Sequence, residues 1–485
     1  MPPSHTHSLR HALLLACAVA GPAMADDHVT LEDLARRLQA LEERTGTAST
    51  EPAVDAAALD QRLRILERKL ELQDEAAAAK AATQPTVSLS PEKGLSVKSP
   101  GDDGVELKFK ALVQADGRMF LGDTQNPQND TFLWRRVEPT LEGSWGRLVG
   151  FRIQAQLAGD TASINDAYVD LRFDPRATVR AGKFKVPFGL EQLESSGGLP
   201  AIERNLPNEL VPGRDYGVQV QGEFLSGTLN AAVNVANGTP DGRDGAASNP
   251  DNHFEYAGRV FWEPFKNDAN AWSGLGVGLA GSVGDTTGNG DAVLPRYRTP
   301  GQVRFFNYRA DRATGGSDVL ADGQRLRWSP QGYFYRGPFG LLAEYVVSEQ
   351  DVRLAGGAND GVQRSIRNDA YGATASVVLT GEDASYKGVV RPNHPFRIGE
   401  AGWGAFELVG RYGRLDIDDD AFPLFADPAK SAASASSWTI GVNWYLTGNV
   451  KLVANYSQTF FDGGASNGQD REDERALFTR LQFSF

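Results

Sequence analysis

The chain has 485 residues, and its formal net charge of -13 argues against nucleic acid as a partner, because such binding depends on neutralising phosphates with basic residues. Its one cysteine, Cys17, lies near the start, so a disulfide framework and a thiolate metal site are excluded. Hydrophobic residues make up 41% and the mean hydropathy is -0.37, values that fit a soluble protein and a membrane β-barrel equally well.

Residues 1–25 have the pattern of a secretory signal peptide. Arg10 precedes an apolar run from Ala12 to Ala20, and Ala23-Met24-Ala25 has the small-x-small form of a cleavage site. The alternative is a lipid-attachment box ending at Cys17, which would leave a short apolar run ahead of the cysteine. We therefore predict an exported protein, and the rest of the chain has no apolar run of about 18 residues that would form a membrane helix.

Residues 26–82 carry leucines at 3-4-3 spacing. The two sets are Leu31, Leu34, Leu38 and Leu41, then Leu59, Leu63, Leu66 and Leu70. Apolar a and d positions with charged residues between them predict a coiled coil, and a single amphipathic helix lying on another surface is the alternative. Residues 83–104 are rich in Ser, Pro and Gly and are predicted to be a linker.

From Val105 to Phe485 the hydrophobic period changes to two. In the last stretch, Arg475–Phe485, Leu481, Phe483 and Phe485 share one face while Arg480 and other polar residues occupy the opposite face. We count about sixteen such runs, and an even number is expected of a closed bacterial barrel. They begin near residues 105, 131, 148, 164, 177, 215, 228, 253, 273, 324, 338, 367, 402, 436, 449 and 475.

Short and long connections alternate along this region, as periplasmic turns and external loops do. One connection, near 381–401, falls on the short side and is nevertheless long. A soluble β-sandwich or propeller is the alternative, but the chain shows no blade repeat of roughly 40 to 50 residues. The predicted fold is therefore all-β, a 16-stranded antiparallel transmembrane β-barrel over 105–485 with an N-terminal α-helical coiled-coil extension.

The stretch from Ala177 to Asp215 concentrates basic residues on a strand and the long loop after it. Arg180 occupies an even position of the strand and Lys183 and Lys185 occupy odd positions, so a regular strand would direct Arg180 to one face and the two lysines to the other. Because Gly182 lies between them, we expect a β-bulge there that turns all three basic side chains toward the lumen.

Several segments in combination resemble the phosphate-selective porins of the O and P type. They are GKFKVPFGLE, ERNLPNELVPGRD followed by YGVQ, DAYVDLRF, YRTPGQVRFFNY and LTGEDASYKG, and the resemblance covers the whole barrel region. It implies a homotrimer of 16-stranded barrels whose third external loop folds into the pore. It also implies a path of Arg and Lys side chains that hands anions inward.

Carried over by residue, the resemblance places Arg135 and Arg136 at the constriction, although adjacent strand residues can both face the lumen only across a bulge. The remaining residues of the implied anion path are Arg180, Lys183 and Lys185 on the fifth strand, Arg204 and Arg214 in the infolded loop, and Asp170 in the DAYVDL strand. Arginine offers phosphate bidentate donors and lysine offers a point charge. The alternative is structural ion pairing, for example of Arg180 with Glu191 or Glu194.

Little in the sequence indicates catalysis or metal binding. His28, His253 and His394 are the histidines beyond the signal peptide, none has metal-ligand spacing, and the chain contains no GxSxG. We therefore predict no enzyme activity, no metal site and no cofactor.

These inferences together predict a porin of the Gram-negative outer membrane, with the coiled coil in the periplasm, that passes small anions passively. Phosphate or polyphosphate is the expected solute. Acidic external segments such as Asp416–Asp420 leave a second interpretation open, the same barrel without phosphate preference. A third is an envelope-linking protein in which the coiled coil is the working part and the barrel is an anchor.

Overall fold

The computed structural model describes residues 84–90, 94–101, 103–122, 128–388 and 391–485, with isolated helical positions between 65 and 75. The chain divides into two compact units, Met1–Ala79 and Lys80–Phe485. In the first unit, Arg68 and Glu71 form an exposed ion pair at 2.8 Å. The signal peptide at 1–25 and most of the predicted coiled coil at 26–82 lie outside the described residues, so both stay predictions.

Strands make up most of the second unit. They are β1 (Thr86–Ser90), β2 (Gly94–Lys98), β3 (Val105–Phe120), β4 (Thr131–Trp145), β5 (Val149–Gln156), β6 (Ser163–Asp174), β7 (Ala177–Lys185), β8 (Arg214–Phe224), β9 (Leu229–Ala236), β10 (Glu255–Trp262), β11 (Leu275–Gly288), β12 (Arg296–Arg298), β13 (Arg304–Asn307), β14 (Asp318–Arg336), β15 (Phe339–Ala355), β16 (Gln363–Val378), β17 (Ala405–Asp416), β18 (Ala432–Tyr445), β19 (Val450–Gly463) and β20 (Glu474–Ser484). The short helical turns are α3 (Leu190–Leu193), η1 (Leu206–Leu210), η2 (Arg312–Thr314), η3 (Asp419–Ala421) and η4 (Ser466–Gly468).

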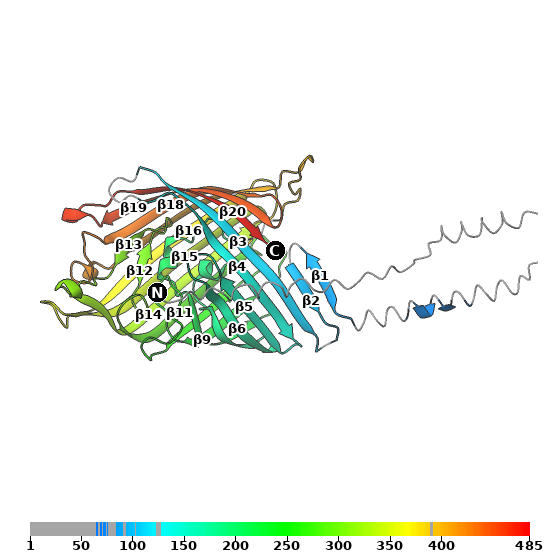
Figure 1. Cartoon of the computed structure of the whole chain (residues 1–485), viewed down its shortest axis with the longest axis horizontal. Coiled ribbons are helices and arrows are strands. Elements are labelled where there is room, and N and C mark those ends of the chain that lie inside the picture. The colour runs from blue at the N-terminus through cyan, green and yellow to red at the C-terminus, as the bar shows by residue number, and fades with distance from the viewer. Residues whose placement is uncertain are drawn as a thin grey trace, which may run out of the picture. The chain divides into compact units, whose positions relative to one another are not determined.

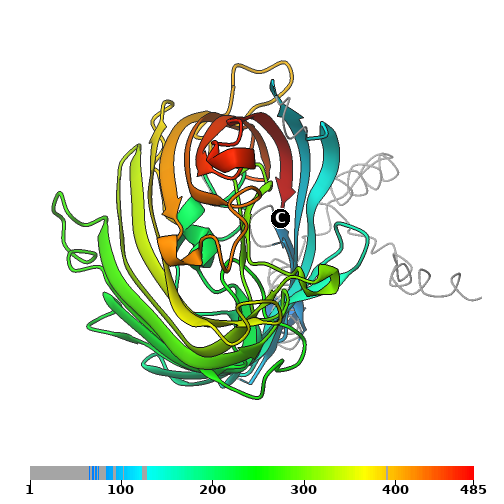
Figure 2. The same ribbon diagram turned by 90° about the vertical axis from the view of Figure 1, so that its left-hand side faces the viewer.

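Sixteen of these strands form a closed antiparallel barrel, seen from the side in Figure 1 and along its axis in Figure 2. From β3 onward each wall strand pairs with the next, with β12–β13 set apart as a hairpin, and β20 pairs back to β3 with Ser484 opposite Leu112. The predicted sixteen-stranded barrel is thereby confirmed. The largest difference is β14, which begins at Asp318 rather than near 324, because a register shift between Ala321 and Arg325 interrupts the alternation there.

The wall has an apolar outer face and a polar inner face, as the period of two predicts. In β20, Leu481 is 51% exposed on the outside while Arg480, one residue earlier, is 4% exposed on the inside. Arg480 forms a bidentate pair with Asp116 of β3, with N–O distances of 2.6 and 2.7 Å. The closing seam is therefore held by backbone pairing and by a lumenal ion pair.

Loops at one end of the barrel fold back into it. A hydrophobic cluster joins inward wall residues to loop residues, among them Val346 and Ile366 from the wall, Phe188 and Leu210 from residues 186–213, Tyr297 and Phe306 from the β12–β13 hairpin, and Phe425 from the loop before β18. Figure 2 shows loop segments and short helical turns inside the ring of strands. The lumen is thus narrowed by packed loops, which leaves a restricted path for solutes.

The segment interpreted as a linker, 83–104, carries regular structure. β1 and β2 form an antiparallel hairpin, with Val87 opposite Val97 and Leu89 opposite Leu95, and β2 pairs with β3. Its Ser-rich composition hides a short apolar alternation in TVSLS and GLSVK, which the linker interpretation did not use.

The bulge expected at Gly182 is wrong. Pairing runs without a shift through this residue, which lies opposite Tyr168 on one side and Gly217 on the other. Gly182 instead has a φ of +130°, a conformation that L residues rarely adopt, and a Cβ there would lie 2.2 Å from the carbonyl oxygen of Ala167.

We expect Gly182→Ala to destabilise the barrel by about 1–3 kcal/mol or more, because the side chain would meet both backbone strain and the Ala167 carbonyl. The folded fraction that resists SDS before heating would measure the loss. Gly410→Ala in β17 is the matched control, since a Cβ there meets nothing within 4 Å. Equal thermal transitions for the two variants would contradict the prediction.

Candidate functional site

Residues 186–213, here called the infolded loop, join β7 to β8 and cross the lumen to the opposite wall. Near its start, the carboxylate of Glu344 on β15 accepts a hydrogen bond at 2.9 Å from the backbone N–H of Glu191. Farther along, the Ile202 N–H donates to Asn455 of β19 at 2.8 Å, and Asn443 of β18 donates to the Pro200 carbonyl at 2.8 Å. The loop is therefore fixed at several points of the wall and divides the lumen.

The tip of the loop is held by Glu203, which lies among arginines. Arg135 of β4 forms a bidentate pair with it at 2.6 and 3.0 Å, and Arg118 of β3 donates to it at 2.8 Å. Although burial acts to raise it, the pKa of Glu203 is held below its usual value by Arg135, Arg136 and Arg118. Glu203 is thus an ionised anchor in the middle of a basic cluster.

Arg135 and Arg136 both face inward because the structure has the bulge that adjacent arginines require. Arg136 lies opposite Gln114 and Trp134 lies opposite Ala115, which leaves Arg135 as the extra residue of β4. Arg136 donates to the Gln114 side chain at 2.8 Å. The partners of Arg135 and Arg136 show that both help to secure the loop and the adjoining wall.

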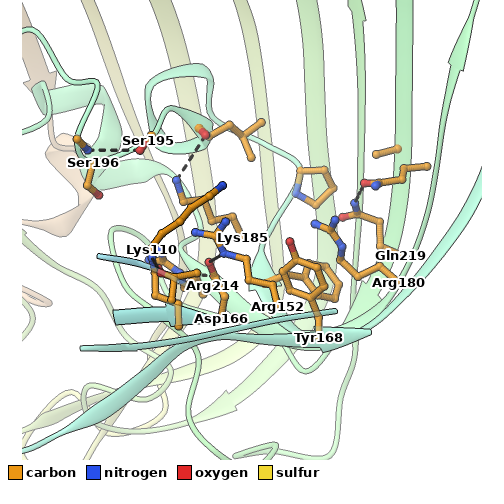
Figure 3. A pocket seen from close by; sticks show the side chains of 18 of the residues that line it. Lys110, Arg152, Asp166, Tyr168, Arg180, Lys185, Ser195, Ser196, Arg214 and Gln219 are labelled. Atoms are coloured by element: carbon orange, nitrogen blue, oxygen red, sulfur yellow. Dashed lines mark hydrogen bonds and ion pairs between the residues drawn. The ribbon is translucent and has the colours of Figure 1, made fainter. Parts of the chain in front are cut away.

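An open cavity of about 970 Å³ is lined by residues of the infolded loop and of the wall formed by β3 to β10. Seven basic side chains line it: Lys110, Arg152, Arg180, Lys185, Arg214, Arg259 and Arg391. Figure 3 shows Arg152, Asp166 and Arg214 side by side, with Arg180 next to Tyr168. Three of the seven, Arg180, Lys185 and Arg214, are among the residues the sequence predicted.

Carboxylates orient most of the arginines in this cavity. Asp166 pairs with Arg214 at 2.8 Å and with Arg152 at 3.3 Å, and Glu142 pairs with Lys110 and Arg152. Each guanidinium carries five N–H groups, so these pairs occupy only part of the donors of the arginines that line the cavity.

Arg180 pairs with Asp170 at 2.8 and 3.1 Å, so the suggested pairing of Arg180 with Glu191 or Glu194 is wrong. Its guanidinium also lies 3.8 Å from the centre of the Tyr168 ring. Asp170 is accordingly a salt-bridge partner, and the aromatic contact fixes the plane of the arginine.

Lys185 differs from its neighbours in its hydrogen bonds. Its ammonium donates to the backbone carbonyls of Glu194 at 2.8 Å and Leu193 at 3.4 Å, both in the infolded loop. It therefore places a basic amino group at the border between the loop and the cavity without a hydrogen bond to a carboxylate.

Two predicted residues lie away from the cavity lining. Lys183 is buried and donates to the Ile164 carbonyl at 2.9 Å, with its ammonium 5.5 Å from the Tyr216 ring. Arg204 donates to the carbonyls of Glu191 and Glu194 at 3.1 Å and ties the infolded loop to itself. Both have structural contacts rather than positions on the cavity wall.

The sequence reasoning missed Lys110, Arg152, Arg259 and Arg391 as site residues. Lys110 and Arg152 stand at polar positions of alternating strands, so their inward direction was readable, but nothing in one strand shows which wall the loop leaves open. Arg259 donates to Gln331 of β14 at 2.9 Å, a partner 72 positions away.

Residues 379–404 form the long connection at the end of the barrel where the other turns are short, and this connection contacts the infolded loop. The Tyr386 hydroxyl donates to the Leu190 carbonyl at 2.7 Å, and its ring stacks on Tyr333 with centroids 4.9 Å apart. The exception to the short-long rule thus has a structural reason.

We expect anion conductance to fall between pH 7 and pH 9. Burial, reinforced by Glu191, raises the pKa of the Glu194 carboxyl to about 8, so this group is neutral at pH 7 and becomes negative as the pH rises. The new charge would appear near Lys185 and Arg204, and a unit charge a few ångströms from a watery path is worth roughly a twofold to fivefold change. Current recordings in lipid bilayers would show it.

The control for this pH effect is Glu194→Gln, which keeps the shape and removes the titration. Its conductance should vary less between pH 7 and pH 9 than that of the unmodified protein. Identical pH profiles for both proteins would contradict the assignment.

Within the described residues, no helix is long and apolar enough to cross a membrane, and no group of three or more His, Cys, Asp or Glu side chains is arranged to hold a metal ion.

A closed sixteen-stranded barrel with an apolar outer wall, a polar lumen and an infolded loop defines a porin, a channel protein of the Gram-negative outer membrane rather than an enzyme. The family model described as "Phosphate-selective porin O and P" matches residues 106–485, and the chain belongs to this family.

The chain is 26% identical over 420 residues to Porin O of Pseudomonas aeruginosa, covering 81% of this chain and 91% of that protein. Among solved structures, the outer membrane channel DcaP of Acinetobacter baumannii superposes with a TM-score of 0.50 at 13% identity, over 79% of this chain and 97% of the other. An anion-selective porin from Comamonas acidovorans gives a TM-score of 0.48 at 13% identity, over 79% and 100%.

Proposed function

We propose that the protein passes small anions across the outer membrane by passive diffusion, with phosphate or polyphosphate as the preferred solute. The observation that carries the proposal is the convergence of seven basic side chains on the cavity beside the infolded loop. Ammonium and guanidinium groups replace part of the hydration that an anion loses in a narrow pore, and guanidinium matches the geometry of phosphate oxygens. The descriptions of the family and of Porin O support the phosphate preference.

A second candidate is the same channel without phosphate preference. It is favoured by the ion pairs of Arg152, Arg180 and Arg214, because each carboxylate offsets part of the positive field that would attract a multiply charged anion.

Single-channel recording in planar bilayers tests the proposal. We expect reversal potentials in a salt gradient to show anion over cation permeability, and conductance to saturate as phosphate is raised. Anion permeability without saturation supports the second candidate. Cation permeability or no conductance would refute the proposal, and the last result would favour an envelope-linking role.

We further propose that the porin is a homotrimer and that residues 26–82 form a periplasmic coiled coil that aids its assembly. Deleting 26–82 should lower the fraction of SDS-resistant trimer while leaving single-channel conductance unchanged. Loss of peptidoglycan or cell-surface binding, with trimers intact, would instead favour the envelope-linking role.

A further inference from the structure

The β1–β2 hairpin extends the barrel sheet from the position where the last strand stops. Phe485 exchanges backbone hydrogen bonds with Ala111 of β3, both at 3.1 Å. Farther toward the start of β3, its edge is taken by β2, with Leu95 opposite Phe109 and Lys98 opposite Glu106. Figure 1 shows β1 and β2 beside β3 at the end of the barrel where the C-terminus lies. The hairpin is therefore part of the wall.

The two faces of the hairpin continue the two faces of the barrel. The cross-strand register puts these apolar side chains on one face: Val87 and Leu89 of β1, Leu95 and Val97 of β2, and Leu107 and Phe109 of β3. Ser88, Ser96 and Lys108 share the opposite face, which is the lumenal side. Val87 is 65% and Leu89 77% exposed. Exposed aliphatic side chains at the end of a polar, Ser-rich segment require an apolar partner.

Trp145 indicates how deep in the membrane this face lies. This residue ends β4, lies opposite Val105, and is 68% exposed on the outer wall. Tryptophan at such positions marks the boundary between hydrocarbon and headgroups. The residues Leu107 and Phe109, which adjoin the hairpin, lie two and four positions along β3 from Val105.

Within the described part of the chain, the only strand that β1 pairs with is β2, and residues 86–89 make no backbone hydrogen bond on the other edge. The N–H and C=O groups on its other edge need partners that hydrocarbon cannot supply but that water and headgroups can. An apolar face and a hydrated edge together fit the interface zone of a leaflet rather than its centre or the open periplasm.

We propose that the β1–β2 hairpin is a lipid-contact element, whose apolar face rests on acyl chains of the periplasmic leaflet while its outer edge lies among the headgroups. The face continues the lipid-facing wall residue by residue. Its four side chains also present much less area than the roughly 800 Å² per partner that a stable protein interface buries, which favours lipid over a second copy. The hairpin would then hold residue 84 at the membrane surface.

Single cysteines carrying an environment-sensitive fluorophore test this proposal. On a Cys17→Ala background, the full-length protein would bear Val87→Cys or Leu89→Cys, with Ser88→Cys as the control on the opposite face, and would be reconstituted into phosphatidylethanolamine–phosphatidylglycerol vesicles. Nitroxide-labelled phospholipid should quench positions 87 and 89 several-fold more strongly than position 88.

Aqueous iodide serves as the opposing quencher. Iodide quenching of positions 87 and 89 that equals that of position 88 would overturn the proposal by placing the hairpin in water. Protection from both quenchers would overturn it by showing that protein, such as a second copy, covers the face. Leu107→Cys on the adjoining wall gives the lipid-quenched reference, and SDS-resistant mobility before heating verifies that each labelled barrel is folded.

Discussion

Glu203→Ala is expected to destabilise the attachment of the infolded loop by about 3–5 kcal/mol, because removal of one partner of a buried ion pair leaves the others uncompensated. Arg135 and Arg118 both donate to this carboxylate, and Arg135 does so with two hydrogen bonds. Without Glu203, the arginines would face one another across a buried space and repel. The tip of the loop should then leave the wall and the channel should conduct more, with weaker selectivity.

Two measurements check this expectation. The heating temperature at which the SDS-resistant form is lost should fall, and single-channel conductance should become larger and noisier. Glu400→Ala is the matched control, because Glu400 pairs with Arg397 on an exposed turn at 3.3 Å and such pairs contribute about 0–1 kcal/mol. A Glu203→Ala channel with unchanged conductance and thermal transition would show that the other wall contacts hold the loop unaided.

The direction of each side chain in the barrel wall depends on the local sequence, which is why the wall was predictable. Successive side chains of a strand point to opposite faces, so the outward direction of Leu481 and the inward direction of Arg480 follow from their being neighbours in the sequence. The hairpin at 86–98 escaped prediction because its two strands are five residues each and its serines resemble a linker.

The contacts of the site are long-range, and single-sequence reasoning reached them only through the family resemblance. Glu203 and Arg135 are 68 positions apart, and the position of Glu203 depends on how the whole loop crosses the lumen. Arg180 pairs with neither Glu191 nor Glu194 of the loop, because the cross-strand register places Asp170 directly opposite it. The expectation that Lys183 faces the lumen depended on a bulge at Gly182 that is absent, whereas the bulge that Arg135 and Arg136 require is present.

Lys185→Gln is expected to lower the anion-to-cation permeability ratio about fivefold, since removing a unit charge about 4 Å from a watery path changes an ion's energy by about 1 kcal/mol. Glutamine retains an N–H donor for the Glu194 and Leu193 carbonyls that Lys185 now contacts, so the loop should stay in place while the charge is lost. Reversal potentials in a salt gradient give the ratio directly.

Two further lysines show whether position, rather than net charge, controls selectivity. Lys266→Gln makes the same change of charge on an exposed turn, where the lysine pairs with Glu263 at 2.7 Å, and should leave the ratio unaltered. Lys183→Gln lies only two residues from Lys185 but off the cavity lining, so it should affect folding more than selectivity. An equal loss of selectivity in all three variants would mean that anions respond to the overall charge of the protein, and the cavity beside the infolded loop would then no longer be the selective part of the channel.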